Sequence, residues 1–131
     1  MDYCFEPRSQ LHNNLHFSAF EEKLNEIINN FNIHNNPVKN STDFFYNFLQ
    51  IHPFIDGNGR IARMLLSFCL MLTNIIPFPI ILSSGHSKPR KHYLQAIINR
   101  QDKNKDNDLY YLVKINILRT WRNFNTFCGN I

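Results

Sequence analysis

Residues 52–72 read HPFIDGNGRIARMLLSFCLML, a polar, glycine-containing run followed directly by a strongly apolar one. The glycines at positions 57 and 59 predict a turn. Beyond that turn, apolar residues recur at steps of three and four, which predicts a strongly apolar helix. The recurring residues are Ile61, Met64, Leu65, Phe68 and Leu72. The stretch therefore predicts a polar loop at the N-terminus of an apolar helix.

Two further helices are predicted upstream of this loop. Residues 17–31 have an apolar face of helical period, and Ser18 followed by Glu21 resembles a capping box at its start. Residues 37–51 begin with a proline, which suits the first helical position. This second helix should end near residue 51, because His52 precedes a proline and is biased away from helical geometry.

The downstream half is also predicted to be helical. We expect residues 74–82 to be extended, residues 89–100 to form a helix, and a last helix to run from about Asp108 to Phe127. Three residues of the 89–100 segment should point inward, namely Tyr93, Ala96 and Ile97. The sequence therefore predicts an all-α protein of about five to six helices.

Length and composition restrict the class of protein. A chain of 131 residues is one domain, here residues 1–131, with a helical core over 17–127 and a loop or flap region over 1–16. Three cysteines without C-x-x-C spacing indicate reduced thiols in a cytosol-like compartment, its own or a host's. Prolines interrupt the most apolar stretch, 64–82, so no membrane span is expected. The net charge of +4 suits an anionic ligand, but without a basic block no nucleic acid partner is expected.

The polar loop has the chemistry of a phosphate site. Residues 57–59 read Gly-Asn-Gly at a predicted helix N-terminus, where backbone N–H groups lack intrahelical partners and the helix dipole favours anions. Arg60 and Arg63 are one turn apart and could bind a di- or triphosphate. Asp56 could hold Mg²⁺ on phosphate oxygens, and His52 could act as a base. Each residue alone also has a structural explanation as turn, cap or solvated charge.

Together, residues 52–63 match the Fic family signature H-P-F-x-[D/E]-G-N-G-R-x-x-R at every specified position. The chain resembles that family more loosely from about Phe17 to Phe127. The resemblance implies a Fic fold. In that fold residues 1–16 could form a short β-hairpin flap instead of a loop. It also implies transfer of AMP from ATP to a Ser, Thr or Tyr hydroxyl of a target protein, with release of pyrophosphate.

The resemblance also implies roles for single residues. His52 would deprotonate the target hydroxyl, and Asp56 would hold Mg²⁺. The phosphate cradle would be residues 57–59, with Arg60 on the β-phosphate and Arg63 on the γ-phosphate. Two more roles concern aromatic residues: Phe54 would anchor the loop in the core, and Tyr93 would lie near the adenine, although a buried core position explains Tyr93 equally well.

Departures from the family pattern bear on the reaction and its control. Doc-type kinases resemble this loop but have Lys where Gly59 stands, so Gly59 favours AMP transfer over phosphate transfer. The inhibitory pattern [S/T]-x-x-x-E-[G/N] has one candidate, Ser18 to Glu22, followed by Lys23 instead of Gly or Asn. We therefore expect Arg63 to be unrestrained within this chain, and inhibition to come from an antitoxin-like partner or a dimer.

Three alternatives to AMP transfer remain at this level. A Fic-fold module could bind a nucleotide without transferring it, but a module of that kind has no need of a base at His52. A transferase of this fold could use another donor, for UMP, phosphocholine or phosphate transfer, because the cradle recognises diphosphate and not the base. A nucleic acid-binding domain would lose affinity steeply with salt.

Overall fold

The computed structural model describes residues 14–82 and 88–129, and these contain helices and no strands. The helices are α1 (Asn14–Asn30), α2 (Pro37–Ile51), α3 (Asn58–Leu72), α4 (Lys88–Asn99) and α5 (Asp108–Gly129). The prediction of an all-α protein is confirmed. Residues 1–13 of the predicted loop or flap region lie outside the described residues, whereas residues 14–16 belong to α1.

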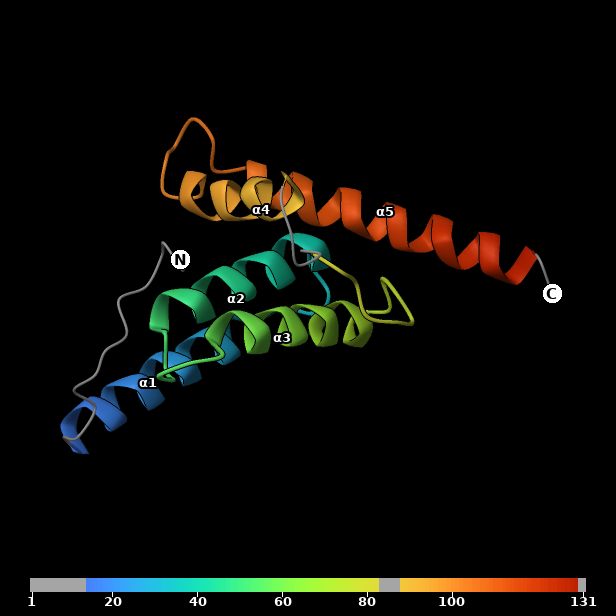
Figure 1. Cartoon of the computed structure of the whole chain (residues 1–131). Coiled ribbons are helices and arrows are strands. Elements are labelled where there is room, and N and C mark those ends of the chain that lie inside the picture. The colour runs from blue at the N-terminus through green and yellow to red at the C-terminus, as the bar shows by residue number, and fades with distance from the viewer. Residues whose placement is uncertain (1–13, 83–87, 130–131) are drawn as a thin grey trace.

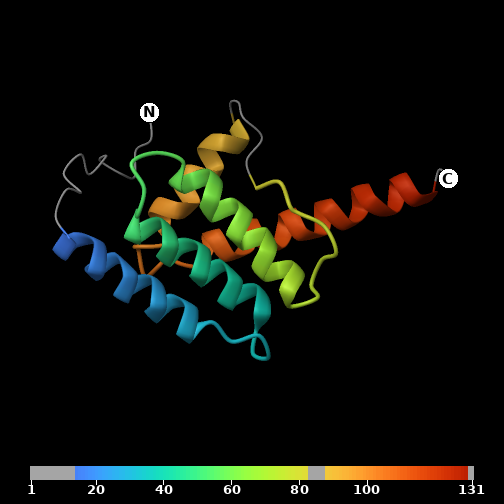
Figure 2. The same cartoon turned by 90° about the horizontal axis from the view of Figure 1, so that it is seen from below.

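Helix α2 lies at the centre of the bundle. It packs against α3 most extensively, and it also contacts α1 and α5 (Figure 1). Helices α4 and α5 pack against each other on the side of α2 that faces away from α1, as Figure 2 also shows. The chain between α2 and α3 is the predicted polar loop. One end of the loop is therefore fixed by α2 and the other by α3.

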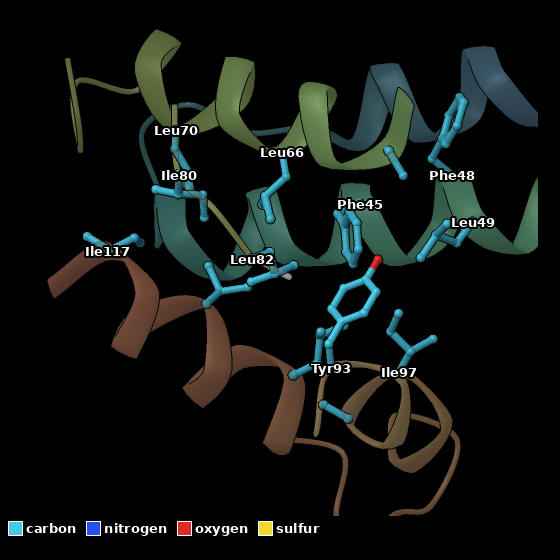
Figure 3. Packing of buried hydrophobic residues seen from close by; sticks show 14 of the residues in the cluster. Phe45, Phe48, Leu49, Leu66, Leu70, Ile80, Leu82, Tyr93, Ile97 and Ile117 are labelled. Carbon is cyan, nitrogen blue, oxygen red and sulfur yellow. The ribbon is translucent and has the colours of Figure 1, made fainter. Parts of the chain in front are cut away.

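The core is formed where α2, α3, α4 and α5 meet (Figure 3). Its fully buried side chains include Phe45 and Leu49 of α2, Leu66 and Leu70 of α3, and Leu109 and Val113 of α5. Tyr93, Ala96 and Ile97 of α4 are also buried, as predicted. The core therefore ties the helices on both sides of the loop to the downstream pair.

The ends of α2 form as the sequence predicts, whereas α1 begins earlier. Pro37 starts α2 behind the N-cap Asn36, whose side chain accepts a hydrogen bond from the Lys39 N–H at 3.4 Å. Helix α1 begins at Asn14, so the predicted start at residue 17 is wrong. Ser18 lies one turn inside α1 and cannot cap it, because capping requires a position before the first turn.

The apolar residues that recur along α3 do not all face the core. Met64 is 71% exposed and Phe68 is 59% exposed. The face that packs on the core is instead rich in small side chains, and its buried members are Asn58, Ala62, Leu66, Ser67, Cys69 and Leu70. Because α3 is apolar on nearly all sides, periodicity alone could not select the face, and small residues allow the closer approach to α2.

The segment after α3 is irregular and not a strand. It turns at Asn74, which has a φ of 61°, and side chains from two other elements fix it. Ser67 accepts a hydrogen bond from the Ile80 N–H at 3.2 Å, and the Trp121 indole N–H donates to the Ile75 carbonyl at 3.2 Å. No helix among the described residues is long and apolar enough to cross a membrane.

The two described cysteines should differ in reactivity. Cys69 is buried in α3, as predicted, and burial raises the pKa of its thiol to about 11, whereas Cys128 is exposed. A thiol with a pKa of about 11 is about one-thousandth ionised at pH 8. The thiolate is the reactive form, so Cys69 should react slowly. We expect iodoacetamide at pH 8 to modify Cys128 and to spare Cys69 until urea unfolds the chain. Equal rates at both positions in the folded protein, by peptide mass spectrometry, would contradict this burial.

Candidate functional site

The loop of the candidate site begins where α2 ends. His52 is the C-cap of α2 and has left-handed backbone angles, φ 50° and ψ 57°, and its N–H donates to the Phe48 carbonyl at 3.2 Å. Such angles are uncommon for a residue with a Cβ and are found most often at functional positions and turns. The chain therefore leaves the α2 axis at His52 itself, and the imidazole lies at the start of the loop.

Asn58 closes the loop from its other end. Its side chain Oδ1 accepts from the Phe54 N–H at 3.0 Å, and its Nδ2 donates to the Phe54 carbonyl at 2.7 Å. Asn58 is 4% exposed, so these hydrogen bonds are shielded from water. The prediction that the Phe54 ring anchors the loop in the core is wrong, because Phe54 is 48% exposed. The backbone of Phe54 is the anchor point instead.

Replacing Asn58 should loosen the loop. In Asn58→Ala the Phe54 N–H and carbonyl lose both partners, and we expect the free energy of unfolding to fall by about 1–3 kcal/mol. Asn58→Asp keeps an acceptor for the N–H but loses the donor, so it should lie between the wild type and Asn58→Ala. Urea unfolding followed by circular dichroism measures this series. An Asn58→Ala protein as stable as the wild type would show that the two hydrogen bonds between the Asn58 side chain and the Phe54 backbone do not stabilise the loop.

The N-terminus of α3 carries the amide groups of the predicted cradle. Gly57 is the N-cap, with a φ of 83° that favours glycine, and the first intrahelical bond runs from the Ile61 N–H to the Gly57 carbonyl at 3.0 Å. The N–H groups of residues 58–60 therefore have no intrahelical acceptor. A Cβ added at Gly59 would lie 3.3 Å from Nη1 of Arg63, so glycine leaves room between the backbone and this guanidinium.

Asp56 and Arg60 lie at the exposed edge of this amide cluster. Asp56 Oδ1 accepts from the Gly57 N–H at 2.7 Å, and its Oδ2 lies 3.5 Å from Nη2 of Arg60. The side chains of Asp56 and Arg60 are 88% and 72% exposed. An ion pair this exposed is weak and screened by salt. The Asp56 carboxylate and the Arg60 guanidinium can therefore separate, and each can then bind a ligand.

Arg63 contacts α4, whereas Arg60 pairs with Asp56. Its Nη1 lies 3.4 Å from the Tyr93 hydroxyl, and its guanidinium lies over the Tyr93 ring at 5.7 Å from the centroid. Tyr93 is only 3% exposed and packs against Phe45 in the core. The structure thus gives Tyr93 a contact with a predicted phosphate ligand, and its contact with adenine stays a prediction.

Removing the Tyr93 hydroxyl tests this contact. Tyr93→Phe keeps the buried ring beneath the guanidinium and deletes the hydrogen bond to Arg63. A single hydrogen bond is worth about 0.5–1.5 kcal/mol, so the affinity for ATP, the ligand that the resemblance implies, should fall by about two- to tenfold, with little loss of stability. Isothermal titration with ATP and Mg²⁺ measures the first effect. If Tyr93→Phe binds ATP as the wild type does, the hydroxyl does not position Arg63.

The Asp56 carboxylate fits a Mg²⁺ site in which a bound phosphate supplies further ligands. Residues 14–82 and 88–129 contain no group of three or more His, Cys, Asp or Glu side chains that could hold a metal. Mg²⁺ is commonly held by one or two carboxylates plus phosphate oxygens and water. The exposed Asp56 beside the amide cluster suits that mode, whereas a metal cage made of protein ligands does not arise in the described part of the chain.

An ion pair that sequence analysis missed fixes α4, the helix that carries Tyr93. Arg100, just after α4, donates to Asp43 of α2 at 2.9 Å, and its guanidinium lies 5.4 Å from the Tyr46 ring centroid. Both members of the ion pair are about 28% exposed, so water screens it less than the pair at Asp56. The two residues are 57 positions apart in the sequence, so no local sequence signal predicts the contact.

Helix α1 places the candidate inhibitory glutamate at the surface. Glu22 is exposed, and α1 packs on α2 through Phe20, Leu24 and Ile27. Among the described residues, no ion pair between Arg63 and a carboxylate is found. Tyr93 contacts Arg63, and the expectation that no inhibitory glutamate of this chain restrains Arg63 stays a prediction.

Comparison with known proteins places the chain in a family. The model of the Fic/DOC family matches residues 2–70, which is more than half of the chain and includes the whole motif loop. Curated relatives named "Protein adenylyltransferase Fic" are similar over parts of the chain. The relative from Aedes aegypti is 38% identical over 60 residues, which are 46% of this chain and 12% of the relative.

Two fruit-fly relatives of the same name align over longer stretches. The one from Drosophila grimshawi is 36% identical over 76 residues, 58% of this chain and 15% of the relative. The one from Drosophila willistoni is 33% identical over 83 residues, 63% of this chain and 16% of the relative. The chain thus spans less than a fifth of the length of these relatives, and no solved structure matches it at a comparable level of significance. With its motif loop between α2 and α3 and a family match over residues 2–70, the chain belongs to the Fic/DOC family.

Proposed function

We propose that this protein transfers AMP from ATP to a hydroxyl side chain of a target protein. One observation carries the proposal. The histidine at the end of α2 and the free amides at the start of α3 are joined by a five-residue loop that Asn58 holds closed through both polar groups of Phe54. Family membership and the printed name of the relatives, protein adenylyltransferase, support the same reaction.

The phosphates of ATP would bind at the N-terminus of α3. The N–H groups of residues 58–60 and the positive end of the helix dipole favour anions there. Arg60 would exchange its exposed contact with Asp56 for the β-phosphate, and Arg63, held by Tyr93, would bind the γ-phosphate. Asp56 would then be available to hold Mg²⁺, which would neutralise phosphate charge.

The transfer step requires a base and an activated phosphorus. His52 would accept the proton of the target hydroxyl. The hydroxyl oxygen would form a bond to the α-phosphorus while the bond from that phosphorus to the bridging oxygen breaks, and pyrophosphate would leave with the bonding electrons. The amides of α3 would stabilise the charge that develops on the phosphate oxygens. Gly59 supports AMP transfer over phosphate transfer, because the Doc-type kinases have Lys at this position.

Labelled nucleotides test the proposal. The wild type and Arg60→Ala are incubated with Mg²⁺ and α-labelled ATP, alone and with cell lysate, and a parallel series uses α-labelled UTP. We expect label from ATP on a protein band with the wild type and much less with Arg60→Ala. Label from UTP alone would assign another donor. Tight ATP binding without label on any protein would assign a nucleotide-binding module and contradict the proposal.

A further inference from the structure

The core-facing side of α5 continues beyond the core. Leu109, Val113 and Ile117 are at most 7% exposed, whereas Phe124 and Phe127, about two and three turns beyond Ile117 on the same side, are 39% and 68% exposed. Figure 1 shows the C-terminal turns of α5 extending past the other helices. Among the residues that the structure describes, Phe127 is left largely uncovered, and an exposed apolar face of this kind marks an interaction surface.

This side of α5 forms one wall of a groove. The groove has a volume of about 490 Å³, and the second wall is the irregular segment 78–82. Its apolar lining includes Phe78, Ile81, Phe124 and Phe127, and its polar lining residues are Asn116, Arg119, Thr120 and Asn123. The C-terminal turns of α5 and the segment 78–82, which line it, lie at the end of the molecule opposite the motif loop (Figure 1), so the proposed transfer site does not account for the groove.

An aromatic cluster fixes one end of the groove. The ring of Phe78 lies 5.4 Å from that of Trp121 and 4.8 Å from that of Phe124, measured between centroids. The hydrogen bond from Trp121 to the Ile75 carbonyl holds the two walls together at this point. The groove is therefore formed before any ligand arrives, which reduces the entropic cost of binding.

The exposure of its walls indicates a macromolecular ligand. Sites for small molecules enclose most of the surface of their ligand. Here Ile81 and Phe127, which lie on opposite walls, are 71% and 68% exposed, so the groove is open along its length. A peptide segment that inserts a few apolar side chains and remains outside suits this shape.

The charges at the groove select the ligand further. Arg119 is the charged side chain among the described residues that line the groove, and none of these lining residues is a carboxylate. After Asp108 the given sequence has no carboxylate side chain, and residues 73–82 are uncharged. A second copy of this chain would bring like charges together on its own α5, which is unfavourable. A partner with carboxylates beside its apolar residues would pair with Arg119.

We propose that this groove between α5 and residues 78–82 binds an acidic, amphipathic segment of a partner protein. Apolar side chains of that segment would cover Phe124 and Phe127, and its carboxylates would lie near Arg119. The inference concerns a docking site and does not depend on the transfer reaction, so either proposal can fail without the other.

A peptide selection on the whole chain tests the proposal. Displayed random peptides of about 15 residues are selected on the wild type after depletion on Phe127→Gln, and the recovered peptides are synthesised. Binding is followed by the fluorescence of Trp121, the sole tryptophan of the chain, whose ring contacts the groove. Phe68→Gln is the matched control, because it removes a similarly exposed phenylalanine from α3. Circular dichroism shows that each variant is folded.

The selected peptides should contain more Asp and Glu than the starting library, next to apolar residues. Their affinity should fall about tenfold or more in Phe127→Gln and in Arg119→Glu, and stay within about twofold of wild type in Phe68→Gln. Failure to recover peptides that distinguish Phe127→Gln from the wild type would overturn the proposal. So would recovery of peptides without excess carboxylates, or a wild-type dimer in sedimentation that Phe127→Gln dissociates.

Discussion

His52→Ala is expected to lower the rate of AMP transfer by about 100- to 10,000-fold, the usual contribution of a general base. ATP affinity should stay close to that of the wild type. The reason is that the proposed phosphate ligands, the amides of residues 58–60 with Arg60 and Arg63, belong to α3, whereas His52 ends α2. The variant thus separates loss of chemistry from loss of binding.

The measurement combines initial rates of label transfer with calorimetric titration of ATP. His34→Ala is the matched control, since His34 is exposed and lies in the turn before α2, away from the motif loop. We expect this control to transfer AMP at the wild-type rate. A His52→Ala protein that retains more than about one-tenth of the wild-type rate would show that His52 is not the base.

Phe45→Ala is expected to lower the free energy of unfolding by about 3–5 kcal/mol, which is the range for truncating a fully buried phenylalanine. Phe45 is 0% exposed and lies between the helices that carry the loop and the helix that carries Tyr93 (Figure 3). Its ring centroid is 6.3 Å from that of Tyr93. The cavity left by its removal would therefore reach the residue that contacts Arg63.

Urea unfolding measures this loss, and Phe68→Ala gives the comparison. Phe68 is 59% exposed on α3, so its truncation should change stability by less than about 1 kcal/mol. Similar losses in the two variants would mean that the core is not centred on Phe45. Because a loss of this size approaches the whole stability of a small domain, Phe45→Ala is studied at low temperature.

The existence of the helices was predictable, and their packing was less so. Pro37 and the proline after His52 fix the ends of α2 through local backbone rules, and the structure follows them. For α3 the glycines at positions 57 and 59 predicted where the helix N-terminus lies. The apolar residues, however, lie on nearly all sides of the helix. The buried face then depends on where Ala62 allows α2 to approach, which is a tertiary effect.

The candidate site shows the same division between local and distant contacts. The order of residues in the motif placed the histidine, the glycines and the arginines around one helix end without knowledge of the fold. The role of the Asn58 side chain and the exposure of Phe54 depend on the turn that the loop makes. The contact of Arg63 with Tyr93 spans 30 residues, and no local pattern predicts it.

The most direct test of AMP transfer follows the two ends of the triphosphate. The wild-type protein is incubated with Mg²⁺ and cell lysate, in one arm with α-labelled ATP and in the other with γ-labelled ATP. We predict that the α label becomes attached to protein and that the γ label appears in free pyrophosphate. Attachment of the γ label to protein, with the α label left in ADP, would mean phosphate transfer and would contradict the account.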